Sequence, residues 1–511
     1  MSAGSAAEGL YAAIAATLAR RAHEVVIEAG SQQLTGAALA AEVQRFASSL
    51  AVLGVQAGAR VAVQAEKSLS QVLLYLACLH VGAAYVPLNP AYGPDELAYF
   101  LGDAEPALLV SDPAREKTSL PLAAAVSARF VTLDKDGRGS FAAALHGAPA
   151  LAPASSIGSA DVAVIIYTSG TTGRSKGAML TNGNLIANAR ALVSTWAITD
   201  RDVLLHALPL FHIHGLFVAL NTLLLAGGRI RLLRSFDPAT VIDGLPRATL
   251  FMGVPTYYTR LLSTGALSRT AAASVRLFVS GSAPLLPATF ADFEVATGQR
   301  IVERYGMSEC GIITSNPLEG VRKPGSVGRP LPGIELRFVD AARRPVEPGA
   351  TGLIEVRGPH VCAGYWRRPL AGTPEFQSDG FFVTGDLGRV DAEGYVHIVG
   401  RAKDMIISGG LNVYPKEIEM VLDALPGVVE SAVFGLPHGD YGEAVVAAIC
   451  ADPGAAPVDV EAVLQAARLR LAGFKVPKVV FIVAELPRNA MGKVQKAELR
   501  ARYAQTFQAR R

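Results

Sequence analysis

An apolar run that leads into a glycine- and hydroxyl-rich loop constrains this chain more than any other feature. The run spans Val162 to Ile166, and residues 167–177 read YTSGTTGRSKG ahead of a helical pattern. A second apolar run, at residues 275–279, ends in the loop SGSAPL. A buried strand followed by a glycine loop and a helix is the repeating unit of parallel α/β sheets, whose ligands bind at the strand ends. We therefore predict an α/β fold with parallel-type sheets.

The composition of the loop predicts a phosphate-binding site. Its glycines allow the backbone to come close to a ligand, and Lys176 together with the hydroxyl side chains offers donors to phosphate oxygens. The loop is not a Walker A motif, because Lys176 precedes a glycine instead of following one. A flexible surface linker is the other interpretation, but a β-branched strand running straight into the loop disfavours it. The residues expected to contact phosphate are Thr168, Ser169, Gly170, Thr171, Thr172 and Gly173.

Length, composition and charge restrict the class of protein. The 511 residues suggest about three domain-sized units, or one large unit and a smaller one. With 47 Lys and Arg against 44 Asp and Glu the formal charge is +3, which argues against a nucleic-acid-binding or polybasic membrane-surface protein. A composition that is 50% apolar and 18% charged excludes a disordered chain. The four cysteines form no CxxC pair, which excludes a zinc ribbon and favours a reducing compartment, the cytoplasm.

We expect no stable membrane anchor. The strongest apolar run, from Val72 to Leu88, is interrupted by His80 and is too short to span a bilayer. It predicts a buried helix that leads into a buried strand. The first 24 residues carry their arginines after the apolar stretch and not before it, so they predict a capped amphipathic helix instead of a secretory signal.

The pattern of elements changes twice toward the C-terminus. From Gly352 the sequence is strand-rich with short turns, which predicts an antiparallel or barrel-like element. After Arg401 the remaining residues alternate helical and strand-like segments and predict a small α+β domain. We place the boundary at residues 400–403, between a domain of residues 1–400 and one of residues 401–511.

Eight segments, in order along the chain, resemble the adenylate-forming enzymes, which include acyl-CoA synthetases, luciferases and the adenylation domains of peptide synthetases. The segments are the loop at residues 167–177 and AYVPLNP, LPLFHIHG, SGSAPL, RYGMSE, VTGDLG, GRAKDMIISGG and LPRNAMGKVQK. One departure is Ser175, where the family usually has proline. The resemblance implies a large AMP-binding domain with a small mobile C-terminal domain, and a reaction that uses ATP, coenzyme A and Mg²⁺.

The resemblance implies roles in nucleotide binding. Tyr305 offers an aromatic face for adenine, and Asp386 corresponds to the aspartate that accepts hydrogen bonds from the ribose hydroxyls. Glu309, with Thr168, is implied to hold the Mg²⁺ that neutralises the triphosphate. Arg401 is similar to the arginine that contacts ribose and phosphate. The remaining residues implied to line the nucleotide site are Gly281, Ser282, Ala283, Gly306 and Ser308, the last in place of the family's usual threonine.

Two lysines are implied to be catalytic. Lys493 matches the lysine of the family's P-x-x-x-x-G-K segment, which begins here at Pro487. Attack of a carboxylate on the α-phosphate brings two anions together, so the transition state needs a cation beside its oxygens. Lys176 is the candidate from the phosphate loop. A solvated loop lysine is the alternative interpretation of Lys493.

The junction before the small domain is implied to be a hinge. In the family this domain adopts two orientations, one for adenylation and one that admits the thiol of coenzyme A. The pivot lies two residues past Arg401, at Lys403. Gly409 and Gly410 follow, and would let a pantetheine arm approach the backbone. A charged surface turn is the other interpretation of this segment.

Arg304 indicates which acid is activated. The family commonly has a small residue just before the tyrosine, and a guanidinium there would clash with a fatty tail but could grip a second carboxylate. His212, His214 and Met307 are further candidates for the acid pocket. The resemblance is strongest to malonyl-CoA synthetases, which predicts malonate or methylmalonate as substrate. A salt bridge from Arg304 to Glu303 or to another acid would instead make the arginine structural.

Other functions stay open at this stage. The segment SNPLEGVRKPGSVGRP is also similar to oxalate-CoA ligases. Short-chain, medium-chain and aromatic acyl-CoA synthetases, and a ligase that loads a carrier protein, use the same chemistry. A non-catalytic nucleotide or acyl-CoA sensor would keep the scaffold, but the presence of Lys176, Glu309, Asp386 and Lys493 argues against it. The oligomeric state does not follow from the sequence.

Overall fold

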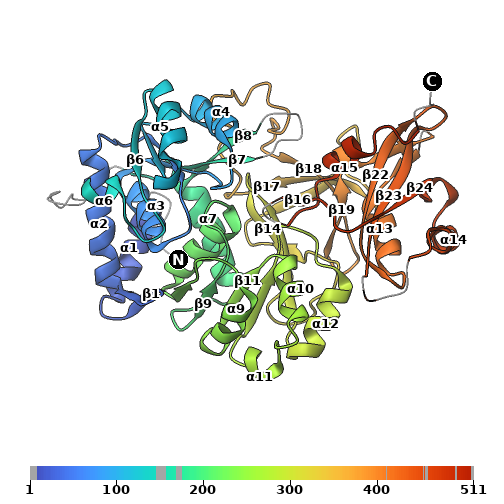
Figure 1. Cartoon of the computed structure of the whole chain (residues 1–511), viewed down its shortest axis with the longest axis horizontal. Helices are drawn as coiled ribbons and strands as arrows, with labels where there is room; N and C mark the ends of the chain where they lie inside the picture. Colours follow the sequence, from blue (N-terminus) through green and yellow to red (C-terminus); the bar gives the residue numbers. More distant parts are fainter. Residues whose placement is uncertain are drawn as a thin grey trace. The chain divides into compact units, whose positions relative to one another are not determined.

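The chain folds into two compact units (Figure 1). Unit 1 comprises residues 1–335 and 356–382, and unit 2 comprises residues 336–355 and 383–511. The domain boundary expected at residues 400–403 stays a prediction. The fold is α/β with parallel-type sheets in the larger unit, as predicted. The structure, a computed structural model, describes residues 8–144, 157–168, 175–409, 411–452, 454, 458–489 and 492–507.

The larger sheet of unit 1 has nine strands, and its central strands run parallel. Every residue of the central strands β11 (Leu250–Gly253) and β12 (Leu277–Ser280) is buried, as strands covered on both faces require. Antiparallel strands lie at both edges. The other strands, in spatial order, are β15 (Arg329–Pro330), β14 (Gly311–Ser315), β13 (Ile301–Met307), β9 (Val203–His206), β10 (Arg229–Leu232), β1 (Val25–Ala29) and β2 (Gln32–Thr35).

The second sheet of unit 1 has six strands, and its edge carries the glycine loop. Strands β6, β5, β3, β4 and β7 run parallel in that order, and β8 pairs antiparallel with β7. Their bounds are β6 (Arg129–Thr132), β5 (Leu108–Ser111), β3 (Arg60–Gln64), β4 (Ala84–Pro87), β7 (Val162–Thr168) and β8 (Lys176–Thr181).

The glycine loop joins two antiparallel strands and not a strand and a helix. Helix α7 (Asn182–Thr195) begins only after β8, so the expectation of a helix directly after the loop is wrong. The side chain of Thr181 accepts a hydrogen bond from the backbone N–H of Asn184 and caps α7 at this point. Before that cap, Ala178 and Leu180 are buried and pair with β7, which satisfies their backbone groups.

The apolar run at residues 72–88 forms helix α3 (Leu69–Val81) and strand β4, as predicted. The helix begins at Ser68, whose side chain accepts from the backbone N–H of Gln71, and ends at Gly82 with φ of 74°. Its residues from Gln71 to His80 are buried. Among the described residues, no helix combines the length and the apolar composition that crossing a membrane requires.

Unit 2 contains two sheets. The first has four strands, of which β18 (Phe382–Val390) and β19 (Val396–Arg401) are antiparallel, as expected for the region after Gly352. Its other strands are β16 (Glu335–Val339) and β17 (Gly352–Arg357). The second sheet has five strands, β20 (Ile406–Ser408), β21 (Leu411–Val413), β22 (Val428–His438), β23 (Gly442–Ala451) and β24 (Val479–Val483).

Two hydrophobic cores lie on the two faces of the five-stranded sheet. Val433 of β22 packs with Leu422 of helix α13 (Pro415–Asp423) and Val463 of helix α14 (Val460–Arg470). The next residue, Phe434, packs with Leu499 of helix α15 (Lys496–Arg502). Successive residues of a strand point to opposite faces, so β22 contributes to both cores.

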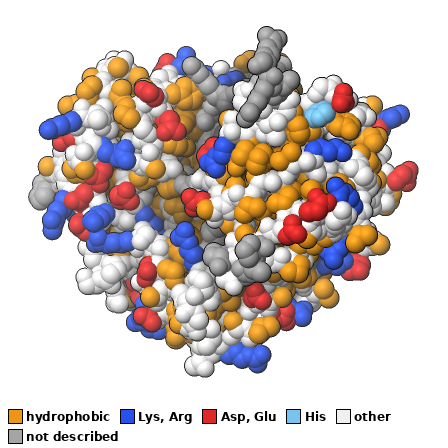
Figure 2. Space-filling view, turned by 45° about the vertical axis from the view of Figure 1, so that its right-hand side comes forward, with side chains coloured by type: hydrophobic (Ala, Val, Ile, Leu, Met, Phe, Trp, Pro, Cys, Tyr) orange, Lys and Arg blue, Asp and Glu red, His pale blue; other side chains and the backbone are white. Residues whose placement is uncertain are grey.

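The surface is mixed in charge. On the face that Figure 2 shows, basic and acidic side chains alternate over the described surface, with hydrophobic side chains between them. This is the distribution that a formal charge of +3 leads one to expect.

One carboxylate joins the starts of three strands in unit 1. Asp202 precedes β9, and it accepts hydrogen bonds from Thr249, which precedes β11, and from Arg276, which precedes β12. The distances are 2.7 Å from Thr249 Oγ1, 2.8 Å from Arg276 Nε and 2.7 Å from Arg276 Nη2. Burial raises the pKa of Asp202, but the hydrogen bonds from Arg276 and Thr199 outweigh it and lower the pKa below its usual value.

Replacing Asp202 with alanine should destabilise unit 1 by about 3 kcal/mol, because it leaves Arg276 partly buried without its partner. Urea denaturation measures the change, and Asp200→Ala, at an exposed neighbour, should cost less than about 0.5 kcal/mol. The folded-state pKa is depressed, so the contribution is present above the unfolded pKa of about 3.9 and is lost as the pH falls through the folded pKa. Equal effects of the two variants at pH 7 would contradict this role.

Candidate active site

The β7–β8 hairpin brings together the two described ends of the phosphate loop. Thr168, the last residue of β7, lies opposite Lys176, the first residue of β8. Both side chains are positioned by the same antiparallel pairing. The loop residues Ser169, Gly170, Thr171, Thr172 and Gly173 lie outside the described residues, so their expected contacts with phosphate stay predictions.

Glu309 lies in the turn between β13 and β14, next to the hairpin. Its Oε1 accepts hydrogen bonds from Thr168 Oγ1 at 3.1 Å and from Tyr365 Oη at 3.2 Å, and the residue is buried. The backbone N–H of Cys362 donates to the Glu309 carbonyl at 2.7 Å. A carboxylate and a hydroxyl are the hard oxygen ligands that Mg²⁺ prefers, so this pair fits the ion implied by the sequence.

Lys176 is held by an acid and an aromatic ring. Its ammonium forms an ion pair with Glu375 and lies 5.0 Å from the centre of the Tyr365 ring. Burial, followed by the charges of Glu309 and Glu375, raises the pKa of Tyr365, so its hydroxyl stays protonated and remains a donor to Glu309. One phenol therefore contacts both the lysine and the glutamate that the sequence singled out.

The turn that carries Glu309 depends on close backbone approach. Tyr305 lies opposite Thr314, and Gly306 opposite Ile312, across the β13–β14 pair. A Cβ at Gly306 would lie 2.2 Å from the carbonyl oxygen of Gly311, so no larger residue fits there without moving β14. Tyr305, Gly306, Met307 and Ser308 are each partly exposed, which leaves them accessible to a ligand.

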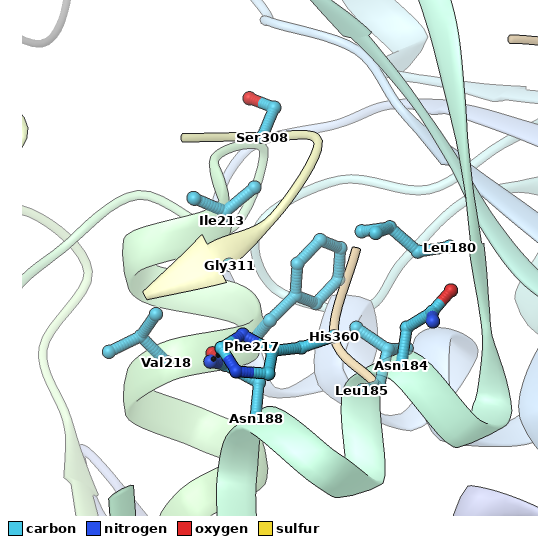
Figure 3. A pocket seen from close by; sticks show the side chains of 10 residues that line it. All are labelled: Leu180, Asn184, Leu185, Asn188, Ile213, Phe217, Val218, Ser308, Gly311 and His360. Carbon is cyan, nitrogen blue, oxygen red and sulfur yellow. Dashed lines mark hydrogen bonds between the residues drawn. The ribbon is translucent and has the colours of Figure 1, made fainter. Parts of the chain in front are cut away.

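A small cavity lies beneath this turn. Figure 3 shows it between Asn188 and Leu185 of α7, Phe217 of the π-helix at His214–Asn221, and His360. It has room for no more than about one water molecule, so it is not a nucleotide site. The side chain of Asn188 donates to the Ile312 carbonyl at 2.9 Å, and His360 Nδ1 lies 2.9 Å from the Cys310 carbonyl. These contacts connect Asn188 and His360 to the β13–β14 turn and stabilise it.

Arg304 is a buried cation without an acidic partner. It is 3% exposed, and within the described residues its Nε and Nη2 make no hydrogen bond and its side chain makes no ion pair. No salt bridge joins the described residues Arg304 and Glu303, and Oε1 of Glu303 instead accepts from the backbone N–H of Leu285 at 3.1 Å. Burial lowers the pKa of Arg304 to about 9, which measures how poorly this position solvates a charge.

The backbone beside Arg304 leaves no room for another side chain. A Cβ at Gly281 would lie 2.4 Å from Cζ and Nε of the guanidinium. Ser282 follows with φ of 73°, in the left-handed region that residues other than glycine rarely adopt. Ala283 is partly exposed. The SGSAPL loop, expected to line the nucleotide site, thus packs its backbone against Arg304.

His212 and His214 face the same guanidinium as neutral bases. Burial, followed by the charge of Arg304, lowers the pKa of His212 to about 4 and that of His214 well below its ordinary value. The backbone N–H of His214 donates to Nδ1 of His212 at 3.3 Å, and Oγ of Ser282 lies 3.4 Å from Nδ1 of His214. Two uncharged imidazoles therefore lie near Arg304, and neither neutralises it.

Lys67 is a buried lysine that was not predicted from the sequence, and through His206 it contacts the segment that carries His212 and His214. Lys67 Nζ lies 3.0 Å from His206 Nδ1 and donates to the His206 carbonyl at 2.8 Å, and His206 Nε2 lies 2.8 Å from the Gly215 carbonyl. Burial lowers the pKa of Lys67 well below its usual value. Tyr365 and Glu375 were missed for the same reason as Lys67, because each is remote in sequence from its partner and no pattern marks it.

In unit 2, Asp386 and Arg401 lie opposite each other on β18 and β19. They form an ion pair with Arg401 Nε 2.7 Å from Asp386 Oδ1. Lys493 titrates in the field of this pair. Desolvation and the charges of Arg401 and Lys403 lower the pKa of Lys493 to about 8, while Asp386 and Asp404 oppose the shift. Three residues of the predicted site therefore share one electrostatic environment.

The expected hinge region is described in part. Lys403 lies in a single 3₁₀ turn (Ala402–Asp404) directly after β19. Gly409 has φ of 59°, and its backbone N–H donates to the Tyr441 carbonyl at 2.8 Å. Gly410 lies outside the described residues. The roles of Lys403 as pivot and of the two glycines in binding pantetheine stay predictions.

Comparison with known proteins gives consistent matches along the chain. Residues 14–366 match the family described as AMP-binding enzyme, and residues 417–493 match the AMP-binding enzyme C-terminal domain. The structure is similar to ATP-bound MatB from Rhodopseudomonas palustris, with a TM-score of 0.94 and 48% identity over 98% of this chain and 100% of that chain. A feruloyl-CoA synthase of Amycolatopsis sp is 38% identical over 94% of this chain and 96% of its own length. A malonate–CoA ligase of Arabidopsis thaliana is 36% identical over 87% of this chain and 78% of its own length.

Glu309→Gln should lower adenylation by about 100-fold while leaving the fold intact. The amide oxygen can still accept from Thr168 and Tyr365, but the charge that would hold Mg²⁺ is gone. ATP–pyrophosphate exchange, measured across a range of Mg²⁺ concentrations, tests this, with Glu319→Gln as an exposed control. An exchange rate and Mg²⁺ requirement like those of the control would remove Glu309 from the metal site.

Proposed function

The chain belongs to the AMP-binding enzyme family and is an acid–thiol ligase, and on this premise we propose that its acid is a small dicarboxylate, malonate or methylmalonate. The ligase forms an acyl-adenylate from ATP and the acid, and then a thioester with coenzyme A. The unpaired guanidinium of Arg304 is the observation that carries the choice of acid.

A dicarboxylate meets the chemical requirement of this pocket. One carboxylate reacts with ATP, so a monocarboxylic acid has no charge left for Arg304. The second carboxylate of malonate can accept two parallel hydrogen bonds from the guanidinium, which has Nε and Nη2 available. The neutral imidazoles of His212 and His214 then border the pair without competing for the anion.

An aromatic acid is the main alternative, because one relative is a feruloyl-CoA synthase. A phenolic ring would cover Arg304 with apolar surface and leave a buried cation unpaired, which is costly. Oxalate is the second alternative and would also supply a second carboxylate. It is shorter than malonate by one methylene, so a panel of carboxylic acids in the exchange assay separates the two.

The reaction assigns separate tasks to the two units. A carboxylate oxygen of the acid attacks the α-phosphorus of ATP, and the bond to the bridging oxygen of pyrophosphate breaks. Lys493 would place positive charge beside the oxygens of this transition state, and Mg²⁺, held by Glu309 and Thr168, would supply charge to the triphosphate. The thiol of coenzyme A then attacks the acyl carbon, loses its proton and releases AMP.

We place the enzyme in the cytoplasm. All four cysteines, Cys78, Cys310, Cys362 and Cys450, are free thiols, and three of them are buried. Free thiols fit a reducing compartment.

Arg304→Ala should lower kcat/KM for malonate by roughly 30-fold to a few thousandfold, because it leaves a substrate carboxylate buried and unpaired at a cost of about 2–5 kcal/mol. The loss for butyrate should be far smaller. Arg304→Lys should recover little, since one ammonium cannot replace the planar fork. Arg247→Ala, at an exposed arginine of the same unit, is the control. An equal fall for both acids would make Arg304 structural and refute the dicarboxylate proposal.

Lys493→Ala should abolish adenylation and leave thioester formation from supplied malonyl-AMP largely intact, because the lysine acts on the α-phosphate only. Pyrophosphate exchange measures the first step, and formation of malonyl-CoA from the adenylate measures the second. Lys475→Ala, at another lysine of unit 2, is the control, and it should change neither rate by more than about twofold. Equal loss in both half-reactions would contradict a role confined to the first.

A further inference from the structure

Backbone and side-chain hydrogen bonds join Lys493 to the described residues that precede it. The N–H of Asn489 donates to the Lys493 carbonyl at 3.0 Å, and the N–H of Gly492 donates to the Asn489 carbonyl at 2.9 Å. The Asn489 side chain accepts from the N–H of Lys493 at 3.0 Å. Gly492 has φ of 74°, and Arg488 pairs with Val494. These bonds connect Asn489, Gly492 and Lys493 with one another.

Arg488 connects the residues before Lys493 to strand β22. Its Nη2 forms an ion pair with Glu430 on β22, and its Nη1 donates to the carbonyl of Gly492 at 2.6 Å. One guanidinium therefore connects a strand of the five-stranded sheet to the peptide that immediately precedes Lys493. The side chains of the ion pair are partly accessible to solvent, with 31% of Arg488 and 23% of Glu430 exposed.

The arrangement needs an arginine. Two nitrogens of a planar group point in fixed directions, one toward a carboxylate and one toward a carbonyl. A lysine ammonium could satisfy either partner, but it could not hold both in the same geometry. Strand β22 holds Glu430 in a fixed position, because it pairs along its length with β23 and contributes to both hydrophobic cores of the unit.

We propose that Arg488, fixed by Glu430, is the positioning residue of Lys493, and that it determines the position of the Lys493 ammonium during adenylation. This inference rests on the proposed role of Lys493. Arg488 acts through the Gly492 carbonyl. The rate of a catalysed step is sensitive to small displacements, since a misplacement of a reacting group by about 1 Å can lower the rate about 100-fold.

The test compares the two half-reactions in Arg488→Gln, Arg488→Lys and Glu430→Gln. Arg488→Gln should slow pyrophosphate exchange by about 10- to 100-fold and change thioester formation from supplied malonyl-AMP by less than about twofold. Arg488→Lys should recover less than half of the lost rate, and Glu430→Gln should cause a smaller loss in exchange alone. Arg468→Gln removes a different arginine–glutamate pair from the same unit and should alter neither step.

A double mutant separates positioning from general stability. In the Lys493→Ala background, which has lost exchange, Arg488→Gln should leave thioester formation from supplied malonyl-AMP unchanged, because the group that it positions is gone. A loss of thioester formation in the double mutant, a full recovery in Arg488→Lys, or equal loss in both half-reactions with a lowered Tm would each overturn the proposal. If Lys493→Ala itself leaves exchange unchanged, the proposed role of Lys493 fails first; if only Arg488→Gln is silent, the positioning role alone fails.

Discussion

The buried charge of Arg304 is the constraint around which unit 1 is arranged. A guanidinium loses much of its hydration when it is buried, and among the described residues no carboxylate forms an ion pair with this one. The surrounding fold must therefore hold the side chain in place by packing. The absence of a Cβ at Gly281 makes room for it, and β13 fixes its backbone between β12 and β14. A buried cation without an acidic partner carries a free-energy cost, which an anion bound beside it would lower.

Strand β13 and its turn carry both the arginine proposed to bind the acid and the glutamate proposed to bind the metal. Glu303 and Arg304 are buried side by side in sequence, yet the glutamate caps the Leu285 N–H while the arginine lies against Gly281. Alternation along the strand keeps these opposite charges apart. Two residues past the end of the strand, Glu309 meets Thr168 from the other sheet. Small shifts of this strand would thus affect both acid binding and the metal site.

Much of this architecture could be predicted from sequence, and the failures have identifiable causes. The parallel sheets, the buried helix before β4, and the helices and strands of the small domain follow from periodicity and turn residues, which act locally. The helix expected directly after the phosphate loop was wrong, because residues 176–181 find a partner in β7 that local pattern does not reveal. Tyr365, Glu375 and Lys67 lie far in sequence from the groups they contact, so only the fold brings them to the site. Whether Arg304 had an acidic partner was likewise a question of three-dimensional packing.

The hydrogen bonds to Glu309 have a consequence for the entropy of metal binding. A free glutamate side chain loses up to about 2 kcal/mol of rotamer freedom when it is immobilised. In this structure, Thr168 and Tyr365 already hold one carboxylate oxygen, so that loss accompanies folding of the chain. A cation bound by Glu309, as proposed, would meet a ligand whose orientation is set. Affinity for the ion therefore depends less on ordering the protein and more on the two donors that order it beforehand.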